Sequence, residues 1–136
     1  MKWTFCLAFC LCIALLEAAD WPNWRGPAFN GISEETDWDP ESIDNILWKV
    51  EVGTGFAGVA AVGGRVYTLG HDGKKSGGQE TVYCLDVKSG KKIWSDSYPA
   101  SLLPRLHEGG PAATPTIHGE RAFTLGKDGK LNCYMA

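Results

Sequence analysis

One stretch decides the fold class: Cys84-Leu85-Asp86-Val87-Lys88-Ser89-Gly90-Lys91-Lys92-Ile93-Trp94. Apolar residues lead into Asp86, whose carboxylate can accept hydrogen bonds from backbone N–H groups two or three residues later. Gly90 can adopt a positive φ without strain. Residues 91–94 then continue as a second strand that ends in a large aromatic side chain. The stretch predicts two strands joined by a tight turn, and nothing in it resembles a nucleophile, a general base or a metal cage.

The composition favours a single, turn-rich β domain. The chain has 136 residues, which is the usual length of one domain. Its 17 glycines and 6 tryptophans suggest many turns and large aromatic anchors. The 13 basic and 16 acidic residues leave a net charge of −3. Nucleic acids and anionic membranes both need a basic face, so we expect neither as the main partner.

Residues 1–19 are typical of a signal peptide. Lys2 supplies the positive start, residues 5–16 form an apolar run too short to span a bilayer comfortably, and residues 18–19 are small enough for cleavage. Glu17 makes the cleavage site imperfect, so an uncleaved anchor is the alternative. We expect an exported chain, periplasmic or secreted, with no transmembrane segment after cleavage.

Residues 20–56 are expected to form an N-terminal arm and a closing strand. Within them, residues 20–33 (DWPNWRGPAFNGIS) are too rich in proline and glycine for a regular helix. Trp21 and Trp24 either pack against the body of the protein or form an aromatic platform for a ligand.

Short apolar and alternating runs predict a series of strands. The first covers residues 46–52, with Trp48, Val50 and Val52 on one face. The others are expected at residues 57–62, 65–69, 81–85, 91–94, 113–117, 121–125 and 131–135. Long connections separate them at residues 70–80 and 99–111. Outside the signal peptide no segment has a helical period, so the predicted fold class is all-β.

The chain also contains an internal repeat. Residues 65–73 (RVYTLGHDG) align with residues 121–129 (RAFTLGKDG) at an offset of 121 − 65 = 56, with six identities. Cys84 aligns with Cys133 at an offset of 133 − 84 = 49, because the first copy has the longer loop. Repeats of about 40–50 residues with four strands each are typical of β-propeller blades. Chance similarity of two hairpins is the alternative interpretation.

The repeat predicts a β-propeller of four-stranded antiparallel blades that is incomplete. One full blade would cover residues 57–95 and a partial blade residues 112–136. A propeller closes only with several blades, each of which buries the faces of its neighbours. We therefore expect the sequence to be an N-terminal fragment or a prematurely ended reading frame, with exposed sheet faces and edges.

The quoted stretch resembles the tryptophan-docking motif of pyrroloquinoline-quinone (PQQ) repeat propellers. That motif has a small residue, an Asp two positions later, Thr/Ser-Gly-Lys in the turn and a closing Trp. The matching residues are Asp86, Ser89, Gly90, Lys91 and Trp94. Cys84 stands where the family usually has Ala. Residues 21–27 with 31–33 also resemble the start of secreted bacterial proteins of this group, and residues 108–115 resemble the lead-in to the inner strand of a blade.

The resemblance implies a fold more than an activity, because the same repeats build dehydrogenases and assembly scaffolds. Our first hypothesis is an exported binding or assembly scaffold without catalysis of its own. It would bind a protein or a small-molecule ligand through its loops. The alternative is a truncated PQQ-dependent oxidoreductase of alcohols or sugars. PQQ and calcium are expected only through the resemblance, and no residue matches the family's catalytic or metal-ligand motifs.

Two clusters have acid–base potential, and both are expected in loops. In the first, His71-Asp72, the repeat replaces His71 by Lys127, and Asp72 is more simply a turn residue. The second comprises Arg105, His107 and Glu108. It precedes an expected inner strand and could face a central channel, so these residues are weak candidates for a ligand site. Ordinary solvated loop residues are the alternative.

The mature chain would keep only Cys84 and Cys133. Two cysteines in an exported chain suggest a disulfide. The repeat argues against it, because equivalent strands of neighbouring blades usually lie further apart than the roughly 7 Å that a disulfide allows between Cα atoms. We expect two buried thiols.

Overall fold

The computed structural model describes residues 19–36, 39, 41, 45–104 and 108–136. The predicted signal peptide lies almost entirely outside these residues. The described part of the chain contains seven strands and no α-helix, which confirms the all-β prediction.

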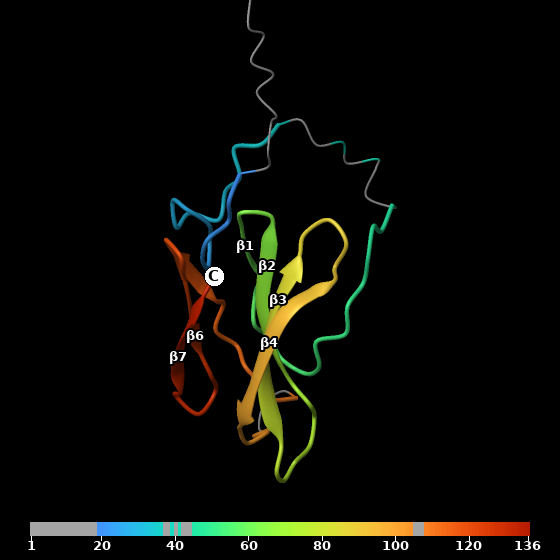
Figure 1. Ribbon diagram of the computed structural model, residues 1–136, viewed down its shortest axis with the longest axis vertical. Coiled ribbons are helices and arrows are strands. Elements are labelled where there is room, and N and C mark those ends of the chain that lie inside the picture. The colour runs from blue at the N-terminus through green and yellow to red at the C-terminus, as the bar shows by residue number, and fades with distance from the viewer. Residues whose placement is uncertain (1–18, 37–38, 40, 42–44, 105–107) are drawn as a thin grey trace, which may run out of the picture.

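The strands form two antiparallel sheets (Figure 1). The first sheet has the order β1-β2-β3-β4, with β1 at Ala60–Val62, β2 at Arg65–His71, β3 at Gln79–Asp86 and β4 at Lys92–Pro99. The second has the order β5-β6-β7, with β5 at Thr116–His118, β6 at Arg121–Leu125 and β7 at Leu131–Met135. In the described residues the two sheets do not close into a ring.

The two sheets repeat the same strand register. Tyr67 pairs with Cys84 in the first sheet, and Phe123 pairs with Cys133 in the second. Ala60 likewise faces Tyr67, as Thr116 faces Phe123. The turn at Gly63-Gly64 fixes the register of β1 against β2, because its two successive positive φ angles match the twist of the flanking strands. The internal repeat of the sequence is therefore a repeat of structure.

The prediction of a strand at residues 46–52 was wrong. These residues belong to no strand, although the half-buried side chains alternate as expected at Trp48, Val50 and Val52. The segment runs along one face of the first sheet instead of pairing with its edge (Figure 1). The carbonyl of Val52 lies where Gly70 has no side chain, so the backbone itself packs on the sheet. Only Thr54, bridged to His71, joins the ladder.

The prediction of a loop at residues 70–80 was wrong at both ends. β2 continues to His71 and β3 begins at Gln79, and both His71 and Glu80 are buried. Polar side chains suggested a loop, but each of these has hydrogen-bond partners that only the folded chain supplies. β4 similarly extends past the predicted blade boundary at residue 95, to Pro99.

The core lies between the two sheets. One cluster joins Ala60, Tyr67 and Cys84 of the first sheet to Ile117 and Ala122 of the second. A second cluster contains Leu69, Val82, Tyr98 and Ala100. Trp94 and Tyr134 pack against both clusters. The second sheet covers one face of the first sheet, and on the other face Trp48 lies against Gly90 and the Val52 carbonyl against Gly70.

The N-terminal arm forms backbone hydrogen bonds with the edge strands β1 and β5 and so joins the two sheets. Trp21 exchanges two backbone hydrogen bonds with Ala61 of β1, at 2.7 and 2.9 Å. The carbonyl of the next residue, Pro22, accepts a 2.7 Å bond from Ile117 of β5. Two consecutive arm residues therefore pair with both sheets, and Trp21 packs over Gly26 of the arm itself.

Candidate functional site

The turn between β3 and β4 is built by the motif that the sequence singled out. Asp86 Oδ1 accepts hydrogen bonds from the Ser89 hydroxyl at 2.6 Å and the Ser89 N–H at 2.8 Å. The hydroxyl bond, followed by the backbone bond, holds the pKa of Asp86 below its ordinary value. The carbonyl of Lys91 accepts from the Asp86 N–H at 2.8 Å, and Gly90 has a φ of +67°.

A tryptophan from the N-terminal region covers this turn. The Trp48 indole N–H donates to the carbonyl of Val87 at 2.9 Å. Its ring lies so close to Gly90 that an added Cβ would be 2.6 Å from the indole. Gly90 is therefore needed for its backbone conformation and also for the space that Trp48 occupies.

Trp94, the last residue of the motif, lies between the two sheets. Its ring centroid is 6.2 Å from that of Tyr67 in the same sheet and 5.2 Å from that of Tyr134 in the second sheet. The Tyr134 hydroxyl donates to Asp96 at 3.0 Å. Burial, followed by this carboxylate, raises the pKa of Tyr134. Cys84 lies directly opposite Trp94 on the neighbouring strand.

A buried carboxylate joins the sheets at their other end. Glu80 is fully buried and accepts hydrogen bonds from the Tyr98 hydroxyl at 2.9 Å and from the Lys127 backbone N–H at 3.1 and 3.3 Å. Burial, followed by Glu80, raises the pKa of Tyr98. The Lys130 ammonium lies 4.5 Å from the centre of the Tyr98 ring, a cation–π contact.

Sequence reasoning missed Glu80, although the sequence carries a signal for it. Glu80 shares the two-residue period of Val82 and Cys84, so a strand that begins earlier than expected places all three side chains on one face. Nothing in the local sequence reveals its partner Lys127, which is 47 residues away.

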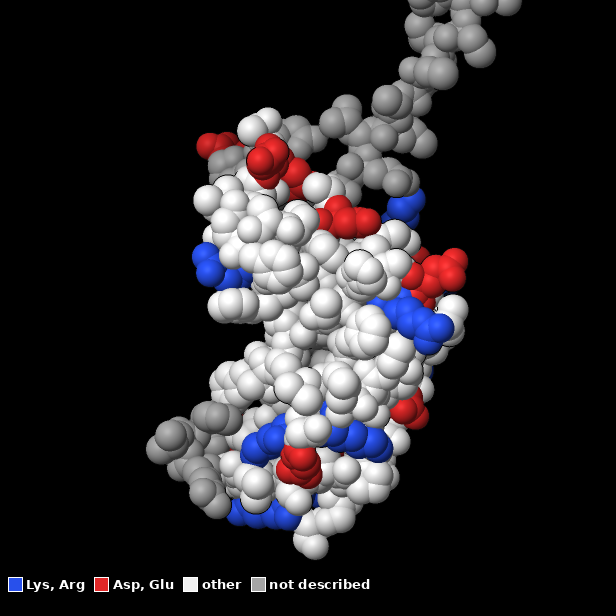
Figure 2. Space-filling model, turned by 90° about the vertical axis from the view of Figure 1, so that its left-hand side faces the viewer, with Lys and Arg blue, Asp and Glu red and all other residues white. Residues whose placement is uncertain are grey.

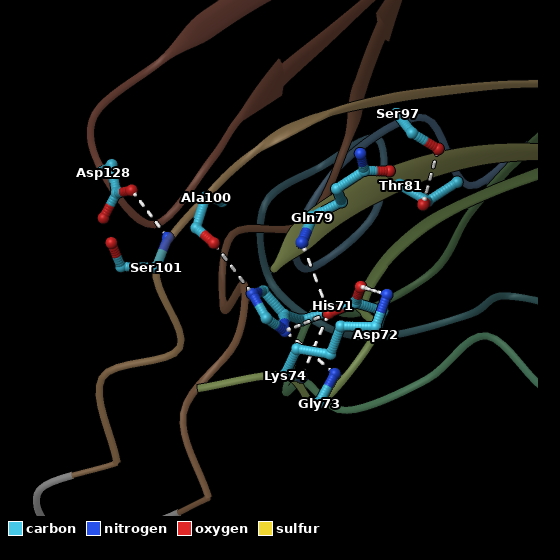
Figure 3. A network of polar contacts seen from close by, with 10 residues as sticks. All are labelled: His71, Asp72, Gly73, Lys74, Gln79, Thr81, Ser97, Ala100, Ser101 and Asp128. Atoms are coloured by element: carbon cyan, nitrogen blue, oxygen red, sulfur yellow. Dashed lines mark hydrogen bonds and ion pairs between the residues drawn. The ribbon is translucent and has the colours of Figure 1, made fainter. Parts of the chain in front are cut away.

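His71 is held by two hydrogen bonds, as Figure 3 shows. Its Nε2 lies 3.1 Å from the carbonyl of Ala100, and its Nδ1 lies 3.0 Å from the Gly73 N–H. These contacts assign the proton to Nε2, because Nδ1 must accept. Asp72 Oδ1 lies 3.4 Å from Nδ1, but that nitrogen already faces an N–H donor, so we regard the contact as packing rather than an ion pair. His71 therefore has a structural role.

An open cleft of about 340 Å³ lies beside His71. Its lining residues are Lys75, Ser76, Gly77, Gly78, Pro99, Ala100, Ser101 and Asp128. Asp128 Oδ2 accepts a hydrogen bond from the Ser101 N–H at 3.0 Å, which links the first sheet's C-terminal loop to the β6–β7 turn (Figure 3). The polar groups named around this cleft thus hold loops in place.

The residues predicted as a ligand site are only partly described. Arg105 and His107 lie outside the described residues. Glu108 is exposed, next to two glycines that pack against Leu102 and Thr54. It is not among the residues that line the cleft. Within the described ranges, no group of three or more His, Cys, Asp and Glu side chains could hold a metal ion.

The prediction of two buried thiols is wrong for Cys133. Both cysteines are free, as expected, but only Cys84 is buried, and burial raises the pKa of its thiol. Cys133 occupies the equivalent position in the second sheet and is exposed, because no described segment covers that face.

Comparison of the sequence with protein-family models and with curated proteins gives no match. In the described part of the chain, no helical segment has the length and hydrophobicity that crossing a bilayer requires.

Proposed function

We propose that the chain is part of a β-propeller of PQQ-like repeats and serves as an exported binding or assembly scaffold without catalysis of its own. The observation that carries this proposal is the contact of Trp94 with Tyr134 across the two sheets. A propeller needs such a contact between successive blades, and here it is supplied by the residue that closes the docking motif.

The exposed face of the second sheet supports the same proposal. In the first sheet, the face towards the core carries Tyr67, Leu69, Val82 and Cys84, each no more than 2% exposed. The equivalent positions in the second sheet are Phe123, Leu125, Leu131 and Cys133. Leu125 is 48% exposed and Leu131 is 69% exposed. A further sheet of the same repeat would bury this apolar face as the second sheet buries that of the first.

The view onto the second sheet's side of the molecule agrees with this role. Figure 2 shows mostly uncharged residues across the middle of this side, with Lys, Arg, Asp and Glu towards its ends. Charged side chains are depleted at the centre of surfaces that become buried.

A scaffold rather than an enzyme is favoured by how the polar side chains are used. His71 engages both ring nitrogens, and Glu80 engages both carboxylate oxygens, in contacts that join loops and sheets. Both side chains are buried, and their hydrogen bonds stabilise the fold. Surface loops would then present the binding residues, as they do on other rigid scaffolds.

Cofactor binding by the purified, exported full chain tests the proposal. The chain is titrated with PQQ in the presence of Ca²⁺ by calorimetry, and dye-linked oxidation of ethanol and glucose is measured in parallel. We expect no saturable PQQ binding and no oxidation. Saturable binding together with substrate-dependent dye reduction would establish the alternative, a PQQ-dependent oxidoreductase. Mass spectrometry of the exported chain tests cleavage after Ala19.

A further inference from the structure

We propose that the cleft beside His71 binds a small zwitterion, a free amino acid or a dipeptide, between the charges of Lys75 and Asp128. This inference does not depend on the proposed scaffold function. Lys75 lies in the β2–β3 loop and Asp128 in the β6–β7 turn, so the cleft lies where the two sheets meet. Its volume of about 340 Å³ is near the lower end of the range of about 300–1,000 Å³ for ligand pockets, which suits a small ligand.

The β2–β3 loop, residues 72–78, distinguishes the first copy of the repeat from the second. The offset between the copies falls from 56 before this loop to 49 after it, so the first copy has 56 − 49 = 7 additional residues here. Lys75, Ser76 and Gly77 belong to this longer loop and line the cleft. The corresponding turn of the second copy, residues 126–130, is short. The repeat alone therefore does not account for the cleft.

Hydrogen bonds hold the walls of the cleft in position. The Ala100 N–H donates to the Gly78 carbonyl at 3.1 Å, and His71 Nε2 lies 3.1 Å from the Ala100 carbonyl. The His71 ring also lies beside Gly78, where an added Cβ would be 2.5 Å from it. Asp128 accepts a bond from the Ser101 N–H and so fixes the wall from the second sheet (Figure 3). Walls that are fixed before binding reduce the entropy lost when a ligand enters.

The loop that carries Lys75 has polar groups without a protein partner. Lys75, Ser76 and Gly77 form no hydrogen bond or ion pair with any residue that the structure describes. The preceding residue, Lys74, instead pairs with Asp72 at 3.3 Å. An ammonium group, a hydroxyl group and backbone N–H groups are thus present at this wall, and all are donors that bind a carboxylate.

Asp128 supplies the opposite charge in the same cleft. Its carboxylate accepts the Ser101 N–H but forms no ion pair with Lys75 or with any other described residue. Two opposite charges that line one cleft without pairing fit a ligand that carries both an ammonium group and a carboxylate. A simple anion such as phosphate fits less well, because the Asp128 carboxylate repels it. Pro99 and Ala100 complete the lining with apolar surface.

An NMR titration of the isotope-labelled full chain with L-alanine and with L-alanyl-L-alanine tests the proposal. We expect saturable shifts of the Ser76, Gly77 and Ser101 amide signals with at least one of them, and no shift of Gly63, in the turn at the opposite end of the first sheet. Alanine alone would identify a free amino acid as the ligand, and the dipeptide alone a peptide. Saturable shifts with neither, or shifts spread evenly over the chain, overturn the proposal. The titration with PQQ is independent of this result, so the two proposals can fail separately.

Derivatives that lack one charge test the two charged residues. Acetylation of the better ligand removes its ammonium group, and amidation removes its carboxylate. Each derivative should bind at least about threefold more weakly, the factor expected when one partly exposed ion pair is lost. In Lys75→Gln the free acid and the amide should bind equally, and in Asp128→Asn the free amine and the acetylated form should bind equally.

Lys49→Gln is the matched control, because Lys49 is exposed and does not line the cleft. It should keep both preferences of the unmodified chain. Asp128→Asn keeps an oxygen that can accept the Ser101 N–H, and unchanged amide signals outside the cleft would show that each variant is folded. A preference for the free acid that persists in Lys75→Gln, or for the free amine in Asp128→Asn, contradicts the proposed site.

Discussion

Trp94 of the first sheet packs against Tyr134 of the second, with ring centroids 5.2 Å apart and planes inclined by 33°. The two residues lie far apart in the sequence, with the connection from β4 to β5 and the β5–β6 hairpin between them. The docking motif therefore forms a local hairpin and also supplies a tertiary contact between the two sheets. Its partner Tyr134 is fixed in turn by the hydrogen bond to Asp96 on the same strand as Trp94.

Trp94→Ala should lower the free energy of unfolding by about 3 kcal/mol, because a large aromatic side chain leaves the inter-sheet core. Urea denaturation of the full chain measures the change. Ile93→Ala is the matched control, since the Ile93 side chain is 47% exposed on the same strand and should lose far less. An equal decrease in the free energy of unfolding for the two variants would show that the contact of Trp94 with Tyr134 does not stabilise the fold.

Glu80→Gln should destabilise the fold by about 1–3 kcal/mol, because the amide presents a donor where Tyr98 and Lys127 both donate. Glu51→Gln, on an exposed residue, should change stability little. A double-mutant cycle with Tyr98→Phe separates the hydroxyl contact from the backbone contact. Additive effects of Glu80→Gln and Tyr98→Phe would show that these two side chains do not interact.

Gly90→Ala and Gly63→Ala separate backbone strain from side-chain crowding. Both glycines have a positive φ, +67° and +57°, but only Gly90 has a neighbour where the Cβ would lie. Gly63→Ala should cost about 1 kcal/mol from the left-handed conformation alone. Gly90→Ala should cost about 3 kcal/mol, because the Trp48 ring must also move. Thermal unfolding measures both changes; equal costs would mean that Trp48 does not pack on the turn.

Stability should fall as the pH rises above about 10. Burial raises the pKa of Tyr98 and Tyr134 above the ordinary 10.0. Above pH 10 the unfolded chain releases protons that the folded chain keeps, so the free energy of unfolding decreases with pH. The contribution is complete below pH 10. In Tyr98→Phe/Tyr134→Phe the alkaline slope of urea midpoints should be shallower; an unchanged slope would contradict the assignment.

Thiol labelling should distinguish Cys84 from Cys133, which occupy equivalent positions in the two copies of the repeat. A short iodoacetamide pulse on the folded chain, followed by peptide mapping, should modify Cys133 and spare Cys84. Cys84 is buried and its raised pKa leaves little thiolate. Unfolding in urea should make the two equally reactive. Protection of Cys133 in the native chain would mean that its sheet face is covered in solution.

The sequence determined the local architecture of the hairpins. The predicted strands at residues 121–125 and 131–135 coincide with β6 and β7, and the Asp86–Gly90 turn forms with the expected hydrogen bonds. These features depend on side chains and turn residues within a few positions, and glycine conformation and Asx hydrogen bonding act at that range. The two copies of the sequence repeat also have equivalent strand registers in the structure.

Only the tertiary structure decided which faces are buried. Trp48, Val50 and Val52 alternate as a strand would, yet they lie across a sheet face, because packing on that face competes with edge pairing. The Glu80 carboxylate can be buried because the backbone N–H of Lys127, 47 residues later, donates a hydrogen bond to it. Cys84 and Cys133 share one sequence pattern, and their burial differs because a second sheet covers the first and no described segment covers the second. Burial is a property of neighbours that the local sequence does not contain.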